Sequence, residues 1–196
     1  SIKKYLEDNL DKDKSINTTL LLKKICDKFS FTELSDQYRR KIKLNDKKIT
    51  EIFLSNLKSA TDWIKKKNQI DLLLEYALKS HPSSSLHTSI HFCNLLKVSA
   101  VESVRNHAGS AILKIMPKLS ISERNEVAVE LLRALEIEGN RFTEYIPGFT
   151  GKAVLWLQPK ELDEIIEDLS EKIKSSNANL KSLILKTIGV TISNYD

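Results

Sequence analysis

Cysteine, glycine, proline and methionine are all scarce in this chain of 196 residues. It contains two cysteines, five glycines, four prolines and one methionine. β-Sandwiches and β-barrels need many tight turns, so the shortage of glycine and proline argues against an all-β fold. No pair of candidate strands is joined by residues typical of a hairpin, and the apolar residues recur at helical spacing. The sequence therefore predicts an all-α protein.

The two cysteines are too few to form a disulfide framework. Cys26 and Cys93 each lie among apolar residues on a predicted helix. We expect both to be buried and reduced, which favours a cytoplasmic (intracellular) protein. A single bridge between them is the alternative.

Long apolar runs are also missing. No segment approaches the roughly 20 apolar residues of a membrane-spanning helix, and the first residues lack the apolar core of a signal peptide. We therefore predict no membrane partner. The chain begins with serine rather than methionine, and a fragment of a larger multidomain protein is one interpretation that this allows.

Residues 101–138 contain the clearest pattern in the sequence, two amphipathic helices with a sharp stop between them. Proline cannot continue a helix, so Pro117 ends the first one. Ser120 and Glu123 have the spacing of a capping box and predict the start of the second. The apolar positions of both helices recur at steps of three or four residues: Val101, Val104, Ala108, Ala111, Ile112, Ile115, Val127, Leu131 and Leu135.

This pattern recurs in the following forty residues. With a shift of 38, residues 123–131 match residues 161–169 in the order of acidic and apolar positions. With a shift of 42, residues 109–113 match residues 151–155, and both segments begin with glycine. Helix pairs of about 40 residues are typical of HEAT and armadillo arrays.

The first of these helices resembles the second helix of a HEAT unit. The resemblance rests on Val104-Arg105, on Ala108 and on the run from Ala111 to Leu113, and Pro117 with the restart after it fits the turn. It covers residues 100–194, and the earlier residues only in outline. The helix-A proline that is usual in the family is not evident.

The HEAT/armadillo resemblance implies an α-solenoid, a right-handed superhelical stack of about five antiparallel helix pairs. It also implies a single domain over residues 1–196, less regular in 1–80 and clearest in 85–194. Such a stack binds a protein or peptide partner on its concave or edge surface. We therefore expect a non-enzymatic interaction scaffold.

Positive charge is concentrated in residues 38–67, which hold ten basic and three acidic residues. A basic patch of this kind can neutralise phosphates, so a nucleic-acid-binding domain is the alternative function. Asn45 and Asp46 are cap residues and predict the start of a long helix that ends at Lys65, Lys66 and Lys67. Lysines near helix C-termini would explain the cluster without a ligand, and aromatic residues interleaved for base stacking are absent. The candidates are Arg39, Arg40, Lys41, Lys43, Lys47, Lys48, Lys65, Lys66 and Lys67.

Negative charge forms matching stripes on the two repeated helices. These acidic residues are either solvated helix faces or a surface for a basic protein partner. The protein-binding candidates are Glu123, Glu126, Glu130, Glu161, Glu164 and Asp168.

Signatures of catalysis are missing. The chain has no glycine-rich phosphate loop and no nucleophile elbow, and His87 and His91 lack an evident third metal ligand. Asp62, Trp63 and Trp156 resemble only in residue type the site of HEAT-like DNA glycosylases, and both tryptophans fall on predicted apolar stripes. We therefore predict no catalytic residue, no metal, no cofactor and no small-molecule substrate.

Overall fold

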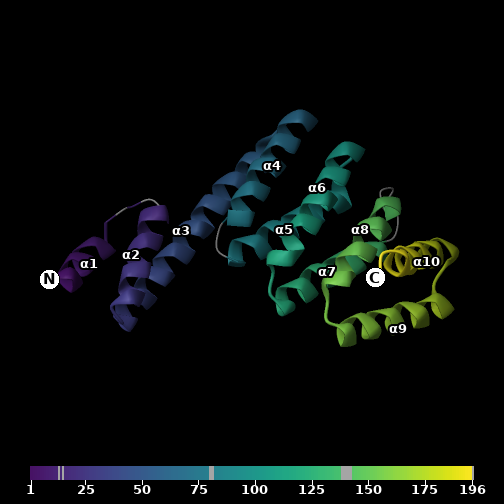
Figure 1. Cartoon of the computed structure of the whole chain (residues 1–196). Coiled ribbons are helices and arrows are strands. Elements are labelled where there is room, and N and C mark those ends of the chain that lie inside the picture. Colours follow the sequence, from purple (N-terminus) through teal and green to yellow (C-terminus); the bar gives the residue numbers. More distant parts are fainter. Residues whose placement is uncertain (13, 15, 80–81, 138–142, 196) are drawn as a thin grey trace. The chain divides into compact units, whose positions relative to one another are not determined.

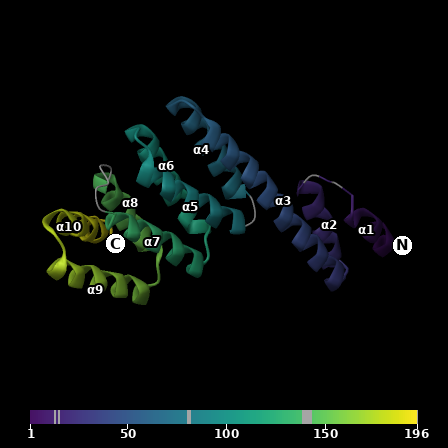
Figure 2. The same cartoon turned by 180° about the vertical axis from the view of Figure 1, so that it is seen from behind.

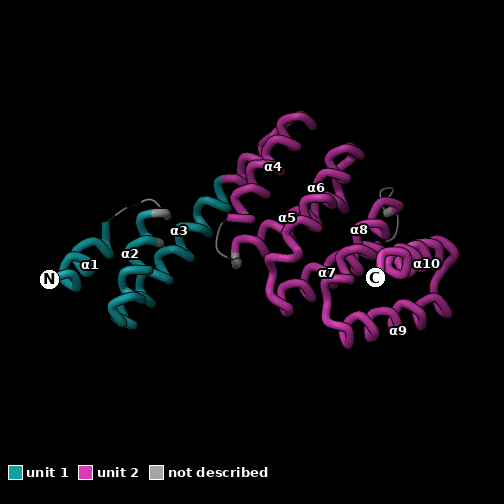
Figure 3. The backbone as a smooth tube through the Cα atoms, in the orientation of Figure 1, with its two compact units in different colours: residues 1–52 teal, residues 53–196 magenta. Residues whose placement is uncertain are grey.

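The computed structural model describes residues 1–12, 14, 16–79, 82–137 and 143–195. In these residues every regular element is a helix, which confirms the predicted all-α class (Figures 1 and 2). The chain divides into two compact units, unit 1 at residues 1–52 and unit 2 at residues 53–196 (Figure 3). The single repeat domain stays a prediction, and the two units are described separately.

Unit 1 contains α1 (Ile2–Leu10), α2 (Ile16–Lys28) and the first part of α3 (Thr32–Ser59). The hydroxyl of Tyr38 on α3 donates a hydrogen bond of 2.6 Å to the carbonyl of Leu6 on α1. Burial raises the pKa of Tyr38 to about 12. The apolar cluster at the centre of this unit consists of Leu6, Leu22, Cys26, Leu34 and Tyr38.

The α3 helix is continuous, whereas Asn45 and Asp46 were expected to begin a new helix. A capping side chain acts only where the backbone leaves the helical region. Here Asp46 is buried within the helix, in a row of positions four apart with Ile42 and Thr50. The expectation of a helix start at this point was therefore wrong.

The described residues of unit 2 form the end of α3 and seven further α-helices. The main apolar core runs from Leu54 on α3 to Leu183 on α10. A second, smaller cluster contains Ala128, Val154, Leu157 and Leu162. The helices are α4 (Trp63–Lys79), α5 (Pro82–Val98), α6 (Glu102–Ile115), α7 (Ile121–Leu135), α8 (Ile146–Ala153), α9 (Pro159–Ser175) and α10 (Ala178–Ser193). Short 3-10 turns lie at Met116–Lys118 (η1), Thr143–Tyr145 (η2) and Val154–Trp156 (η3).

The helices of unit 2 pack in a regular order. In one row α4 contacts α6, α6 contacts α8 and α8 contacts α10, and in the other row α5 contacts α7. Consecutive helices connect the rows, at α4–α5, α5–α6, α7–α8 and α9–α10. Both views show α4, α6 and α8 side by side (Figures 1 and 2).

The two repeated segments have the same local structure. The series α6–η1–α7 is followed by α8–η3–α9, so each copy is a helix, a 3-10 turn and a second helix. The capping box predicted at α7 is confirmed, because Ser120 Oγ accepts from Glu123 N at 3.3 Å and Glu123 Oε2 accepts from Ser120 N at 2.8 Å. At α9, Glu161 Oε2 accepts from Gln158 N at 3.0 Å.

Two glycines bring the helices of one row close together. A Cβ atom on Gly109 of α6 would lie 2.5 Å from the Phe149 ring of α8. A Cβ atom on Gly151 of α8 would lie 2.8 Å from the carbonyl oxygen of Thr187 on α10. The glycines that the shift of 42 relates thus occupy equivalent contacts, each facing the next helix of the row.

We predict that Gly151→Ala lowers the free energy of unfolding by about 1–3 kcal/mol, because the methyl group forces α8 and α10 apart. Gly189→Ala is the matched control, since no atom lies within 4 Å of its added Cβ. It should raise stability by up to about 1 kcal/mol through helix propensity. Urea denaturation of both variants measures the difference. Equal effects would contradict the close contact between α8 and α10.

Candidate interaction surfaces

Three of the predicted acidic residues hold the structure of unit 2 together. Glu123 completes the capping box of α7. Glu161 accepts at the start of α9 and also receives a 2.6 Å hydrogen bond from Asn125 Nδ2 on α7. Glu130 on α7 accepts from Lys97 Nζ on α5 at 2.8 Å. These carboxylates therefore connect helices of one row or fix a helix start.

The Lys97–Glu130 pair is partly shielded from water and connects α5 with α7. The hydrogen bond from Lys97 lowers the pKa of Glu130, and Arg133, 3.2 Å away, lowers it further. A carboxylate that is held in this way keeps its charge to a lower pH than a free glutamate.

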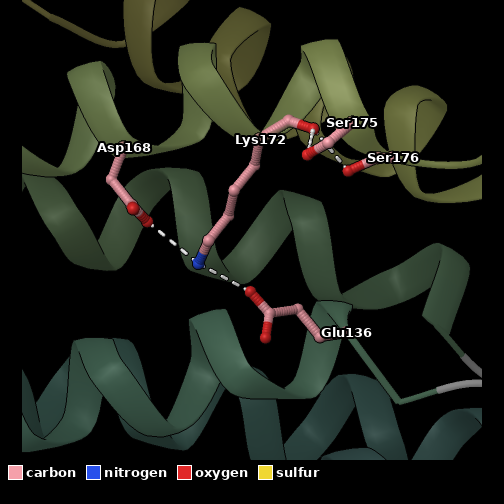
Figure 4. Close-up of polar contacts among 5 residues, drawn as sticks. All are labelled: Glu136, Asp168, Lys172, Ser175 and Ser176. Carbon is pink, nitrogen blue, oxygen red and sulfur yellow. Dashed lines mark hydrogen bonds and ion pairs between the residues drawn. The ribbon is translucent and has the colours of Figure 1, made fainter.

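A second ionic link connects the ends of α7 and α9 (Figure 4). Lys172 Nζ lies 2.7 Å from Glu136 Oε1 and 2.9 Å from Asp168 Oδ2. The hydrogen bonds to Glu136 and then to Asp168 raise the pKa of Lys172. The hydroxyl of Ser176 donates to the carbonyl of Lys172 at 2.6 Å and closes the last turn of α9. Asp168, a predicted binding residue, thus helps to orient Lys172.

The remaining predicted acidic residues are exposed. Glu164 lies 3.8 Å from Lys160 on its own helix. Glu126 has no ion pair within the described residues. The structure thus gives Glu123, Glu130 and Glu161 internal partners and turns Glu126, Glu164 and Asp168 outward. A partner-binding role for these six residues stays a prediction.

A further row of acidic residues on α9 was not among the predicted candidates. Asp163, Glu167 and Glu171 are exposed at positions four apart on α9, and none has an ion pair within the part of the chain that the structure describes. The signal was available in the sequence, because none of the three has a lysine or arginine four positions away on either side. Glu164 and Asp168 each have such a lysine.

The structure corrects the helix-end explanation of Lys65, Lys66 and Lys67. They were expected at a helix C-terminus, but α3 ends at Ser59 and these lysines lie in the first turn of α4. Asp62 Oδ1 accepts from Lys65 N at 2.8 Å, and this backbone hydrogen bond lowers the pKa of Asp62. Cations at a helix N-terminus are opposed by the helix dipole, so the dipole does not explain the three lysines.

The basic residues of α3 also lie away from a helix end. Lys41 Nζ donates to the carbonyls of Leu10 and Lys12 at 2.6 and 2.7 Å, so this lysine closes the end of α1. Arg39 and Lys47 form ion pairs with Asp36 and Glu51. Three further basic residues are exposed and have no ion pair among the described residues: Arg40, Lys43 and Lys48. The candidate patch is thus divided between α3 in unit 1 and α4 in unit 2.

Both tryptophans lie at the surface of unit 2, although both were expected on buried stripes. Trp63 is 49% exposed, with Lys67 Nζ 5.8 Å from its ring centre. Trp156 is 40% exposed, and the Arg124 guanidinium lies 5.7 Å from its ring. Such contacts place a cation on the face of an aromatic ring.

Arg124 connects the turns of the two repeated segments. Its guanidinium donates 3.1 Å hydrogen bonds to the carbonyls of Met116 and Pro117 in η1. It donates a further 3.1 Å hydrogen bond to the carbonyl of Trp156 in η3. One side chain thus satisfies backbone carbonyls of both η1 and η3, which need partners at helix ends.

The cysteines are buried and free, as predicted. Burial raises the pKa of Cys93 to about 12, so its thiolate is disfavoured at neutral pH. The rings of His87 and His91 meet edge to face with centres 4.9 Å apart. Burial and then the charge of His87 lower the pKa of His91. The described residues include no group of three potential metal ligands.

Comparison with protein-family models, with curated proteins and with solved structures gives no match for this chain. The family resemblance therefore stays a prediction from the residue pattern. Among the described residues, no helix combines the length and apolar character needed to cross a membrane.

We predict that Glu130→Gln lowers the free energy of unfolding by about 1–2 kcal/mol at neutral pH, because a charged hydrogen bond is lost. The folded pKa of Glu130 lies below its ordinary value of 4.5. Its contribution is therefore present above pH 4.5 and is lost as pH falls through the folded pKa. Urea denaturation between neutral and acid pH should show the variant and the parent converging. A constant difference would contradict this role of the Lys97–Glu130 pair.

Proposed function

We propose that unit 2 is a HEAT/armadillo-type α-solenoid and that it serves as a non-enzymatic scaffold for a protein partner. The observation that carries this proposal is the repetition of α6–η1–α7 in α8–η3–α9. Both copies place a glutamate at the same capping position and a glycine against the next helix of the row. The right-handed superhelical stacking that the resemblance implies is part of the proposal.

The order in which the helices contact one another supports a stack. A helix of an α-solenoid contacts its neighbours along the array, so the array can grow without closing on itself. The contacts α4–α6, α6–α8 and α8–α10 follow this rule. In such arrays the exposed helix faces bind extended or helical segments of other proteins.

The outward acidic residues support a partner with basic side chains. Glu126 and Glu164 are exposed, and neither bonds to another helix. A carboxylate at the rim of an interface chiefly guides a basic partner to the surface and fixes its orientation.

Affinity capture with the full chain, after nuclease treatment and with identification of the bound protein, tests the proposal. The double variant Glu126→Lys with Glu164→Lys is compared with the parent chain. The matched control is the pair Asp8→Lys and Glu51→Lys in unit 1. Asp8, like Glu126, is exposed and has no ion pair among the described residues. Glu51, like Glu164, is paired with a lysine four positions earlier. We expect the first pair to weaken the identified complex by about tenfold and the control to leave it unchanged.

A partner that binds both double variants equally well would contradict the role of Glu126 and Glu164. Failure to recover any specific protein would contradict the scaffold proposal.

Nucleic-acid binding is the second candidate function. It is favoured by the position of Lys65, Lys66 and Lys67 in the first turn of α4, where the helix dipole does not explain them, and by the exposed ring of Trp63 beside them. In the same capture experiment without nuclease, binding of duplex DNA that weakens steeply with salt would support this alternative.

A further inference from the structure

A groove of about 640 Å³ lies between the first half of α9 and the end of α10. Leu162 and Ile166 of α9 and Ile192 of α10 are its apolar lining residues. Ile192 is 68% exposed and Tyr195, at the same edge, is 64% exposed. These exposed apolar side chains are available for contact with another molecule.

Acidic side chains line one edge of this groove. Asp163 and Glu167 are among its lining residues, and Glu171 continues the row along α9. None of the three has an ion pair within the described ranges, whereas Glu164 and Asp168 on the same helix are paired with lysines. Like charges four residues apart on a helix repel one another. The row therefore lacks compensating cations where it borders the exposed apolar groove.

The packing order of unit 2 shows what kind of element fits such a groove. A pair of consecutive helices, such as α5 and α6, is followed by further helices that pack against each member, α7 on α5 and α8 on α6. No helix of the described residues follows α10, so no such further pair packs on α9 and α10. A helix packs on others at an interaxial distance of about 8–10 Å by placing its side chains between theirs.

We propose that the α9–α10 groove binds an amphipathic helix of a partner protein, with an apolar face of leucine- or isoleucine-like side chains and a flank of lysine or arginine residues four apart. The apolar face packs on Leu162, Ile166 and Ile192, and the basic flank pairs with Asp163 and Glu167. This is the helix-in-groove mode of recognition. The inference rests on the proposed scaffold function and names the chemistry of its partner.

The charge of the groove argues against other occupants. A row of carboxylates repels the phosphates of a nucleic acid and the headgroups of an anionic membrane. A second copy of the chain is another possible occupant, and the experiment below separates it from a partner helix.

The test is a selection from a displayed library of helical 18-residue peptides against the full chain. The peptides keep one apolar face and carry random residues on both flanks. We expect the selected peptides to carry lysine or arginine four apart on one flank. Their affinity, measured by fluorescence anisotropy, should fall as salt rises, because exposed charges are screened.

Variants of exposed residues locate the binding site without disturbing the core. Ile192→Asp, and separately the pair Asp163→Lys with Glu167→Lys, should each weaken the selected peptide by about tenfold. The pair Asp8→Lys with Glu51→Lys makes the same charge change at exposed positions of unit 1, outside the groove, and should leave the affinity unchanged. Thermal unfolding checks that every variant remains folded.

The proposal is overturned if no helix is selected, if the selected flanks carry no basic preference, or if the groove variants bind as the parent does. Concentration-dependent dimerisation that Ile192→Asp abolishes would assign the groove to a second copy and overturn it too. A protein partner that is captured normally by the groove variants would leave the scaffold function standing and remove only this inference.

Discussion

The close approach of α8 to α6 and to α10 is the constraint on which unit 2 depends. Gly109 of α6 lies against Phe149 of α8, and Gly151 of α8 lies against α10. At the second contact the hydroxyl of Thr191 donates to the carbonyl of Gly151 at 3.2 Å. Neither position has room for a Cβ atom, because the Phe149 ring lies against Gly109, and the Thr187 carbonyl and the Val190 side chain of α10 lie against Gly151. The apolar core forms between the two rows.

Charged residues then reinforce the second row. Lys97 and Glu130 connect α5 with α7, while Asn125–Glu161 and Glu136–Lys172 connect α7 with α9. Isolated surface ion pairs contribute little to stability, but here they repeat from helix to helix and fix the alignment of the row. The exposed acidic residues without such links, Glu126 on α7 and Asp163 and Glu167 beside the α9–α10 groove, are the ones to which the proposed basic partner would bind.

Much of the local structure could be predicted from the sequence, because its causes are local. The apolar period of 101–138, the stop at Pro117 and the capping box of Ser120 and Glu123 act within one or two helical turns. The burial of Cys26 and Cys93 followed from their apolar neighbours. The shift of 42 aligned Gly109 with Gly151, although the sequence did not show that both face the next helix.

The candidate sites could not be predicted as well, because their causes are distant in the chain. The partners of Glu130 and Glu161 lie on other helices, at Lys97 and Asn125, which no helical period reveals. Asn45 and Asp46 have the side chains of helix caps, yet packing kept α3 continuous, and tertiary contacts commonly override such preferences. Lys65 lies near the start of α4 because α3 ends at Ser59, so a second misplaced boundary, between α3 and α4, changed the interpretation of the basic cluster.

Distances between spin labels test the stacking of unit 2 most directly. Labels at exposed positions Leu72 of α4, Ser110 of α6 and Lys186 of α10 lie in one row of helices. Neighbouring helices of a row are about 8–10 Å apart. The account therefore predicts that the α4–α10 distance exceeds the α4–α6 distance by roughly 15–20 Å, two further helix spacings. Similar values for the two distances would show a closed bundle and contradict the account.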